Sequence, residues 1–363
     1  MATATPNSTR RAPSPPAKSP PRASKRRRWI IVAAIAVPVL FVAAIGGFGL
    51  LVYQRIGRVH VRFPGSPAGG TTYLLIGSDA RDFVHSASDR QTFGAADAVA
   101  GERADIILLV RRSDNGRVRL LSVPRDLVTQ FPDGAPVRMT MTLLRGPQTV
   151  VDTLCRSLGI GVDHLVIMHF DGLRRLVDSV GGVTMHVPSP ERDLVTGLDI
   201  RHPGAAHLNG QQALAYVRSR HTEVLGVSGW KPVPPTADAR SERAREVLAE
   251  LGSRMHLSAL SPLSSIERLW ALSGAITVDD QAGPFVLRDL ASTLKHVGSI
   301  PEERLPATFH PGVVPTADLH TTPAAGVIGA FQGGQVPGCS LRINHPIGSS
   351  PRGAANTPSG GTP

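Results

Sequence analysis

The residues of this chain best suited to chemistry are arginines, several of which lie close to aspartates. Arg218 and Arg220 are separated by one residue, and Arg103 and Asp105 have the same spacing. Alternate residues of a strand point to one face, so this spacing predicts paired side chains on strands. Two guanidinium groups repel each other unless an anion lies between them, and their planar forks suit phosphate oxygens. Together with Arg125, these residues predict a phosphate site built from separated segments.

Surface ion pairing is the alternative for the most telling of these residues. Arg218 and Arg220 could each pair with Glu223 or Asp238 without any ligand. Exposed ion pairs of this kind are common and contribute little to stability. The spacing alone therefore leaves both interpretations open.

The amino-terminal region has the pattern of a membrane anchor. Residues 1–28 carry eight basic side chains and no acidic one, and Trp29 to Gln54 contains no charged residue. About 20 apolar residues suffice to cross a bilayer. The preceding basic cluster predicts a cytoplasmic amino terminus and an external body, in a single-pass protein of the plasma membrane. A cleaved signal peptide, with small residues at Ala43 and Ala44, is the alternative, although its apolar region is usually about 7–15 residues.

The rest of the chain has the composition of a folded body. Beyond residue 28 there are 31 basic and 28 acidic side chains, a near balance that argues against nucleic-acid binding by the body. We expect five parts: a disordered basic tail (1–28), a transmembrane helix (29–54), a linker (55–70), a catalytic domain (71–335) and a second disordered tail (336–363).

Alternating apolar runs and helical patterns predict an α/β fold. Strands are expected at 72–77, 106–110, 118–123, 164–168 and 183–187, with a hairpin turn at 113–116. Helices are expected at 146–158, 171–180, 208–214, 239–255, 263–272, 284–295 and 324–331, with Arg218 and Arg220 on a strand after the third of these helices. A sheet covered by helices on both faces follows from this mixture.

The two cysteines, Cys155 and Cys339, allow a single disulfide if the body lies outside the membrane. Cys155 also falls on the apolar stripe of an expected helix, where a buried, unbridged cysteine is equally compatible with the pattern. Both possibilities stay open at this stage.

Five segments stand in the order typical of the LytR–CpsA–Psr family, which the chain resembles from about residue 72 to 255 and more weakly to about 335. These segments are 75–81, 102–106, 122–126, 177–183 and 208–220. The resemblance implies an α-β-α sandwich with a central mixed sheet and a hydrophobic pocket for a lipid. It implies a phosphotransferase at the outer face of the plasma membrane, which moves a phosphate-linked glycopolymer from a polyprenyl diphosphate carrier to peptidoglycan.

The resemblance also implies roles for individual residues. Asp79 and Asp105 would hold Mg²⁺ or Mn²⁺, and Asp105 and Arg125 would be catalytic, although both aspartates could instead be strand-end caps or turn residues. The side chains that would bind the pyrophosphate are Arg81, Arg103, Arg218, Arg220, Arg240 and Arg243. Arg240 and Arg243 also lie at helical spacing from Glu242 and Glu246, which favours ion pairing on a solvated face equally.

Two departures from the family pattern bear on function. Residues 138–147 lack the asparagine usual in the family, and Ala244 stands where a glutamine is expected; Ala237 likewise replaces an aspartate. These changes keep two alternatives open beside transfer. One is a non-catalytic scaffold or regulator that binds polyprenyl phosphate or a wall precursor, and the other is a pyrophosphatase that uses water as the acceptor.

Overall fold

The computed structural model describes residues 23–79, 102–234, 239–254, 262–294, 297–310, 312 and 314–342. Two compact units are present, Met1–Leu51 and Val52–Pro363, and each is described by itself. Arg81, Ala237 and Asp238 lie outside the described residues, as does the predicted tail from residue 343 onward.

The first unit consists, in its described part, of most of one long helix. α1 runs from Ala23 to Arg55, and its segment Trp29–Arg55 is long and apolar enough to cross a membrane, with none of it buried. The predicted helix at 29–54 is therefore confirmed as a helix. Because an exposed apolar surface of this length is unfavourable in water, a lipid environment is the one that suits it.

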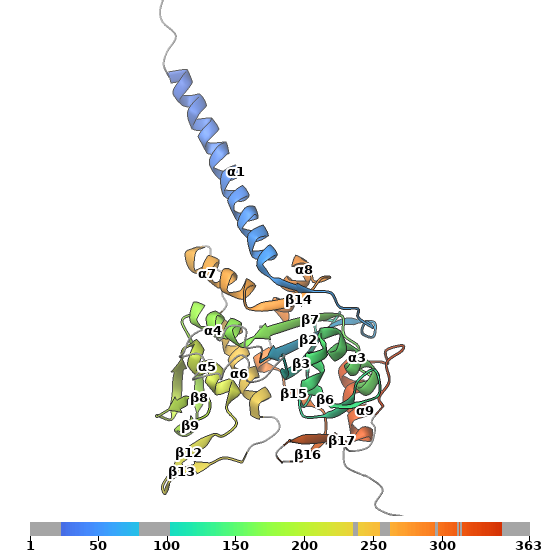
Figure 1. Ribbon diagram of the computed structural model, residues 1–363. Helices are drawn as coiled ribbons and strands as arrows, with labels where there is room; N and C mark the ends of the chain where they lie inside the picture. The colour runs from blue at the N-terminus through green and yellow to red at the C-terminus, as the bar shows by residue number, and fades with distance from the viewer. Residues whose placement is uncertain are drawn as a thin grey trace, which may run out of the picture. The chain divides into compact units, whose positions relative to one another are not determined.

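A seven-stranded mixed sheet forms the centre of the second unit (Figure 1). Its strands, in spatial order, are β1 (Gly57–Val59), β14 (Ile276–Asp279), β7 (His164–His169), β2 (Gly70–Ser78), β3 (Ala104–Ser113), β4 (Val118–Ser122) and β15 (Glu302–Arg304). β2, β3 and β4 are antiparallel to their neighbours in this meander, whereas β2 and β7 are parallel. The predicted hairpin is confirmed: the Ser113 N–H donates to Arg117 O at 2.8 Å, and Gly116 supplies the positive φ of +82° that the turn needs.

Helices cover both faces of this sheet, as the sequence predicts. α3 (Pro147–Leu158) and α9 (Thr321–Gln332) share one apolar core with alternate residues of β2 and β3, among them Leu74, Ile76 and Ile107. The opposite face is covered by α4 (Phe170–Ser179), α5 (Gly210–Arg218), α6 (Ala239–Arg254), α7 (Pro262–Ser273) and α8 (Pro284–Leu294). Strands bury opposite faces with alternate residues, so two cores flank one sheet.

Short elements complete the second unit. They are β5 (Val128–Gln130), β6 (Pro136–Arg138), β8 (Val183–Val187), β9 (Glu191–Asp193), β10 (Leu198–Ile200), β11 (Gly204–Leu208), β12 (Glu223–Gly226), β13 (Gly229–Pro232), β16 (Ala307–His310), β17 (Thr316–Leu319) and the 3₁₀ helices η2 (Met139–Arg145) and η3 (Val297–Ser299). β9, β10, β12 and β13 form a separate four-stranded sheet, and β8–β11, β5–β6 and β16–β17 are antiparallel pairs.

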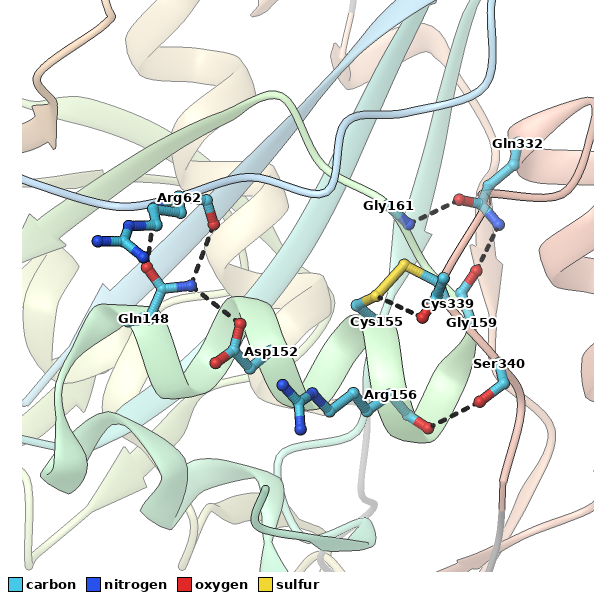
Figure 2. The surroundings of a disulfide bond; sticks show 11 residues. Arg62, Gln148, Asp152, Cys155, Arg156, Gly159, Gly161, Gln332, Cys339 and Ser340 are labelled. Atoms are coloured by element: carbon cyan, nitrogen blue, oxygen red, sulfur yellow. Dashed lines mark hydrogen bonds between the residues drawn. A yellow bond between two sulfur atoms is a disulfide. The ribbon is translucent and has the colours of Figure 1, made fainter. Parts of the chain in front are cut away.

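A disulfide joins Cys155 on α3 to Cys339, which settles the question left open by the sequence (Figure 2). Around it, the N–H groups of Ser340 and Arg342 donate to the carbonyl oxygens of Cys155 and Ser157, both at 3.0 Å. The prediction of a disordered tail from residue 336 is therefore wrong for 336–342. Closing a loop of 184 residues restricts the unfolded chain, and such bridges typically contribute about 2–4 kcal/mol.

Candidate functional site

The paired ends of β2 and β3 bring three of the predicted site residues together. Asp79 follows β2, and its carboxylate accepts the Arg103 N–H at 2.7 Å, while the Asp79 N–H donates to Arg103 O at 3.2 Å. Ser78 pairs with Ala104 in the antiparallel ladder, which places Asp105 one residue inside β3. Asp79, Arg103 and Asp105 therefore share one edge of the sheet.

Arg125 reaches this edge from the turn after β4. Its guanidinium pairs with Asp105 and lies 3.2 Å from the carboxylate of Asp126, and its side chain is only 12% exposed. The turn is held from the other side, because the Thr140 N–H donates to Arg125 O at 2.7 Å. A cation enclosed in this way is fixed in position before any ligand arrives.

Arg218 and Arg220 do reach the same place, but not from a strand. α5 starts with a capping box between Asn209 and Gln212 and continues to Arg218, so the predicted strand is wrong. Ser219 ends the helix with extended backbone (ψ 130°), which redirects the chain toward the cavity. The buried carboxylate of Asp193 accepts the Ser219 hydroxyl at 2.7 Å and the Arg220 N–H at 2.9 Å. The end of α5 and the carboxylate of Asp193 thus bring Arg218 and Arg220 to the cavity, the role that was expected of a strand.

These segments enclose a polar cavity of about 390 Å³, which we call the charged cavity. Its lining includes five arginines and two aspartates, together with uncharged side chains from neighbouring loops. The lining residues are Asp79, Arg103, Asp105, Arg125, Arg138, Thr140, Met141, Phe170, Val195, Thr196, Arg218, Arg220, His221 and Pro315. This excess of positive charge at a partly enclosed site attracts anions.

Electrostatic crowding is visible at Arg220. Burial lowers the pKa of its guanidinium, and the neighbouring Arg125 cation lowers it further, while Asp105, Asp126 and Asp79 act in the opposite direction. One Arg220 nitrogen lies 3.9 Å from the Asp105 carboxylate. Arginine stays charged in proteins. The site therefore holds cations that repel each other, and an anionic ligand would relieve this repulsion.

Several polar atoms of the charged cavity are buried without a hydrogen-bond partner among the described residues. They are Nε of Arg103 and the hydroxyl oxygens of Thr140 and Thr196. Other such atoms lie away from the cavity, on Thr153 and Glu302 for example, but the three in the cavity are placed where a ligand rich in hydrogen-bonding oxygens would satisfy them. Phosphate and sugar hydroxyl groups both have that character.

An apolar cavity of about 190 Å³ lies beside the charged cavity, between the sheet and helices α4–α8. Phe170, the first residue of α4, lines both cavities, and the Arg218 guanidinium lies 5.3 Å from its ring centroid. The remaining lining is aliphatic or sulfur-containing: Ile56, Leu75, Ile76, Gly77, Ile106, Leu108, Val166, Met168, Leu173, Val217, Ala244, Leu248, Leu272, Ile276, Leu287, Leu290, Ala291 and Leu294. The lipid pocket implied by the resemblance therefore has a structural counterpart next to the arginines.

Not every predicted site residue lies here. Arg243 does not line the charged cavity; its guanidinium pairs with Glu191 at 3.0 Å and donates to Tyr216 O at 3.2 Å. The ion pair of Arg243 is thus with Glu191 and not with Glu242 or Glu246 of its own helix. The backbone of Arg240 belongs to α6, but its side chain, like the whole of Arg81, lies outside the described residues.

The sequence did not single out several lining residues. Arg138 and Thr140 come from the segment noted only for its missing asparagine, and Thr196 belongs to no predicted motif. His221 adjoins Arg220, which was the one local signal available. The others come from loops distant in sequence, and only the folded chain places them at the cavity.

The two aspartates of the charged cavity fit a divalent cation that is shared with a phosphate ligand. Mg²⁺ is usually bound by one or two carboxylates, with substrate phosphates and water as its other ligands. Within the described part of the chain, no group of three or more His, Cys, Asp or Glu side chains forms a metal cage. A donor set of Asp79 and Asp105 alone therefore suits an ion that a phosphate completes.

Known proteins are similar to this chain in sequence and in architecture. LcpB of Corynebacterium glutamicum, named a probable cell wall biosynthesis protein, is 34% identical over 154 residues, which cover 42% of this chain and 37% of that protein. TagV of Bacillus subtilis, named a polyisoprenyl-teichoic acid–peptidoglycan teichoic acid transferase, is 27% identical over 251 residues, which cover 66% of this chain and 60% of that protein. The matches thus span less than two thirds of the length of either relative.

A solved structure agrees with these relatives. The LytR-Csp2A-Psr enzyme from Actinomyces oris superposes with a TM-score of 0.61 and 29% identity, over 77% of this chain and 96% of that chain. Residues 55–296, more than half of the chain, match the LytR_cpsA_psr family. The mixed sheet, the arginine-lined cavity and these matches agree, and the chain belongs to the LytR–CpsA–Psr family.

Proposed function

We propose that this protein transfers a phosphate-linked glycopolymer from a polyprenyl diphosphate carrier to peptidoglycan. The observation that carries the proposal is the junction of the two cavities at Phe170. A cationic site beside an apolar one matches a molecule with a diphosphate head and a long hydrocarbon tail. Few other metabolites combine these two properties, and the name of the TagV relative describes a reaction of this class.

The chemistry can be assigned to residues of the charged cavity. A hydroxyl oxygen of peptidoglycan attacks the phosphorus that carries the glycopolymer, a new P–O bond forms, and the bond to the lipid phosphate breaks. Polyprenyl monophosphate leaves with the electron pair of that bond. Negative charge grows on the bridging oxygen, and fixed cations such as Arg125 and Arg220 stabilise it without reorganisation.

The proton of the acceptor hydroxyl requires a base. Asp105 is our candidate, because it lies in the cavity next to Arg125, where the reacting phosphate would be held. A Mg²⁺ or Mn²⁺ ion held by Asp79 and Asp105 would supply further charge neutralisation at the phosphate oxygens. The remaining arginines, Arg103 and Arg218, would fix the orientation of the diphosphate.

The amino terminus supports a location of the reaction outside the cytoplasm. With α1 crossing the plasma membrane and the basic tail in the cytoplasm, the second unit faces the cell wall, where peptidoglycan is found. The disulfide supports this side of the membrane, because such bonds persist in oxidising surroundings outside the cytoplasm.

The two sequence departures affect different cavities. Ala244 lines the apolar cavity and not the charged one, so a missing glutamine there removes a polar group from a lipid-facing wall. Residues 138–147, by contrast, contribute Arg138 and Thr140 to the charged cavity. The absent asparagine is therefore the departure that bears on acceptor positioning and on the alternative of a non-catalytic scaffold or regulator.

One experiment separates the three candidate functions. The full-length protein in proteoliposomes is incubated with a polyprenyl-diphosphate-linked sugar, Mg²⁺ and peptidoglycan fragments, and the products are identified by mass spectrometry. Sugar phosphate attached covalently to peptidoglycan is the expected product. Release of free sugar phosphate would support a pyrophosphatase instead, and tight binding with no product would support the scaffold or regulator.

A further inference from the structure

Three large apolar side chains project from α7 and α8 into solvent. Ile266 and Trp270 of α7 are 44% and 43% exposed, and Phe285 at the start of α8 is 82% exposed. Ile266 and Trp270 are four residues apart and so lie on one face of their helix. Burial of such side chains in an apolar or interfacial environment would be favourable.

These helices adjoin the point at which the chain leaves α1. β14 lies between α7 and α8 in the sequence and pairs with β1, which begins two residues after Arg55, the last residue of the candidate membrane span. The Arg55 guanidinium lies 4.2 Å from the centroid of the Trp270 ring. A Cβ added at Gly274 would lie 3.0 Å from an Arg55 nitrogen, so the arginine lies flat against the end of α7.

Arg55 and Trp270 both belong to the second unit, so their contact is a feature of that unit alone. If Trp29–Arg55 crosses a bilayer, Arg55 is at its surface, and the side chain stacked on Arg55 is at that surface too. Figure 1 shows α7 and α8 at the same end of the second unit, on either side of β14. Trp and Tyr are enriched at the membrane–water interface of membrane proteins.

The charges around the three apolar residues also suit a lipid surface. Arg55 at the end of α1, Arg58 on β1 and Arg288 on α8 are exposed, as is the acidic Glu267 beside Ile266. Asp289, the acidic neighbour of Arg288, forms an ion pair with Arg112 and accepts a hydrogen bond from the Tyr73 hydroxyl at 2.7 Å. Basic side chains beside apolar ones are the pattern of surfaces that bind at lipid headgroups.

The apolar cavity shares these same walls. Leu272 of α7, Ile276 of β14 and Leu287 and Leu290 of α8 line it, as does Ile56, the residue that follows Arg55. A bilayer in contact with α7 and α8 would therefore adjoin the wall of the lipid cavity. A polyprenyl chain could then pass from membrane to cavity without exposure to water.

We propose that Ile266, Trp270 and Phe285 form a membrane-docking surface that inserts into the headgroup region of the bilayer crossed by α1. The docking surface orients the second unit so that the apolar cavity receives its lipid directly from the outer leaflet. This inference rests on α1 spanning a membrane, which is part of the proposed function. It adds a second, independent contact with the same membrane.

The three tryptophans of the chain provide the test. Trp29 lies in α1, Trp270 in the docking surface and Trp230 in the β12–β13 hairpin, which is not part of either. Full-length variants that keep one tryptophan each, the other two changed to Phe, are reconstituted in nanodiscs made with brominated or ordinary phospholipids. Because bromine quenches only nearby indoles, we expect Trp29 and Trp270 each to lose about half of their emission and Trp230 almost none.

The outcomes separate the two ideas. Quenching of Trp29 without Trp270 would overturn the docking surface and leave the membrane span intact. Absence of quenching at both would contradict the span itself. Equal quenching of Trp270 and Trp230 would indicate adsorption without a defined surface, which also overturns the inference.

A second pair of variants tests the surface without relying on one side chain. Ile266→Ser with Phe285→Ser removes two of its three apolar side chains, whereas Leu225→Ser with Val227→Ser changes two exposed residues of the hairpin. We expect Trp270 quenching to fall about twofold in the first variant and not in the second, because interfacial binding scales with buried apolar area. Circular dichroism confirms that both variants are folded, and an unchanged quenching ratio in the first would refute the proposal.

Discussion

The charged cavity and the apolar cavity meet at one phenylalanine, yet they are built by opposite means. In the charged cavity, specific polar partners position the side chain of Arg125, through Asp105 and Asp126, and the backbone of Arg220, through Asp193. In the apolar cavity, side chains from the sheet and five helices contribute only shape and the absence of polar groups. A defect in the first leaves an unpaired charge, whereas a defect in the second changes volume or polarity by degrees.

The comparison predicts that the largest effects on activity will come from the charged cavity. Arg220→Ala removes a half-buried cation without a replacement, and we expect transfer, measured as kcat/KM, to fall about 10²–10³-fold. Arg201→Ala is the matched control, since Arg201 pairs with Asp199 and is 77% exposed outside the cavity. Near wild-type transfer by Arg220→Ala would show that the cavity does not act on the reacting phosphate.

Asp105→Asn tests the same cavity by removing charge while keeping size. We expect transfer to fall about 10²-fold, because an amide can neither accept the hydroxyl proton nor bind a cation as a carboxylate does. The assay is repeated across a Mg²⁺ titration, and the free energy of unfolding is measured to confirm that Arg125 remains well placed. A variant that kept transfer at the wild-type rate would exclude Asp105 as the base.

Asp193→Asn tests a residue that does not line the charged cavity but holds the segment that carries Arg220. Burial alone would raise the pKa of the Asp193 carboxyl, but hydrogen bonds from the His221 N–H, the Ser219 hydroxyl and the Arg220 N–H outweigh burial and hold it below its usual value. Charged hydrogen bonds of this kind contribute about 2 kcal/mol, and we expect a loss of that order in the free energy of unfolding at pH 7.

The pH dependence of this loss gives a further check. A folded pKa below the unfolded value, about 3.9, means that the stabilisation is fully present above that pH and is lost as pH falls through the folded pKa. The difference in unfolding free energy between wild type and Asp193→Asn, measured in urea, should therefore be constant from pH 5 to 7 and shrink below about pH 4. A difference that persists unchanged in acid would argue against the ionised carboxylate as its source.

The smallest effect is expected from the apolar cavity. Ala244→Gln restores the residue expected from the family pattern but places an amide against an apolar wall, where Ala244 is 4% exposed. An unpaired buried amide costs about 1–3 kcal/mol, so we expect long-chain polyprenyl donors to bind about tenfold more weakly. Ala244→Leu is the control for volume alone. Faster transfer by Ala244→Gln would show instead that the glutamine serves the reaction.

The two cavities also differ in how far they could be predicted. Arg103, Asp105, Arg125, Arg218 and Arg220 were identified as one phosphate site from residue type and spacing, and they do line one cavity. The element that carries Arg218 was predicted incorrectly. The capping box at Asn209 and Gln212 starts α5, and this helix continues through Arg218, which was expected on a strand. The apolar cavity had no motif, since any aliphatic side chain serves its walls and such residues occur throughout the chain.

The amino-acid sequence by itself determined the chemistry that is possible here: an apolar anchor, a mixed sheet between helices, and arginines and aspartates at strand ends. These features are local, because hydrophobic periodicity, turn residues and charge are properties of neighbouring positions. Only the tertiary structure decided which groups meet. It brought Thr140 and Thr196 into the cavity, paired Arg243 with Glu191, and joined Cys155 to Cys339 across 184 residues. Such contacts depend on packing between distant segments, for which the sequence carries no local signal.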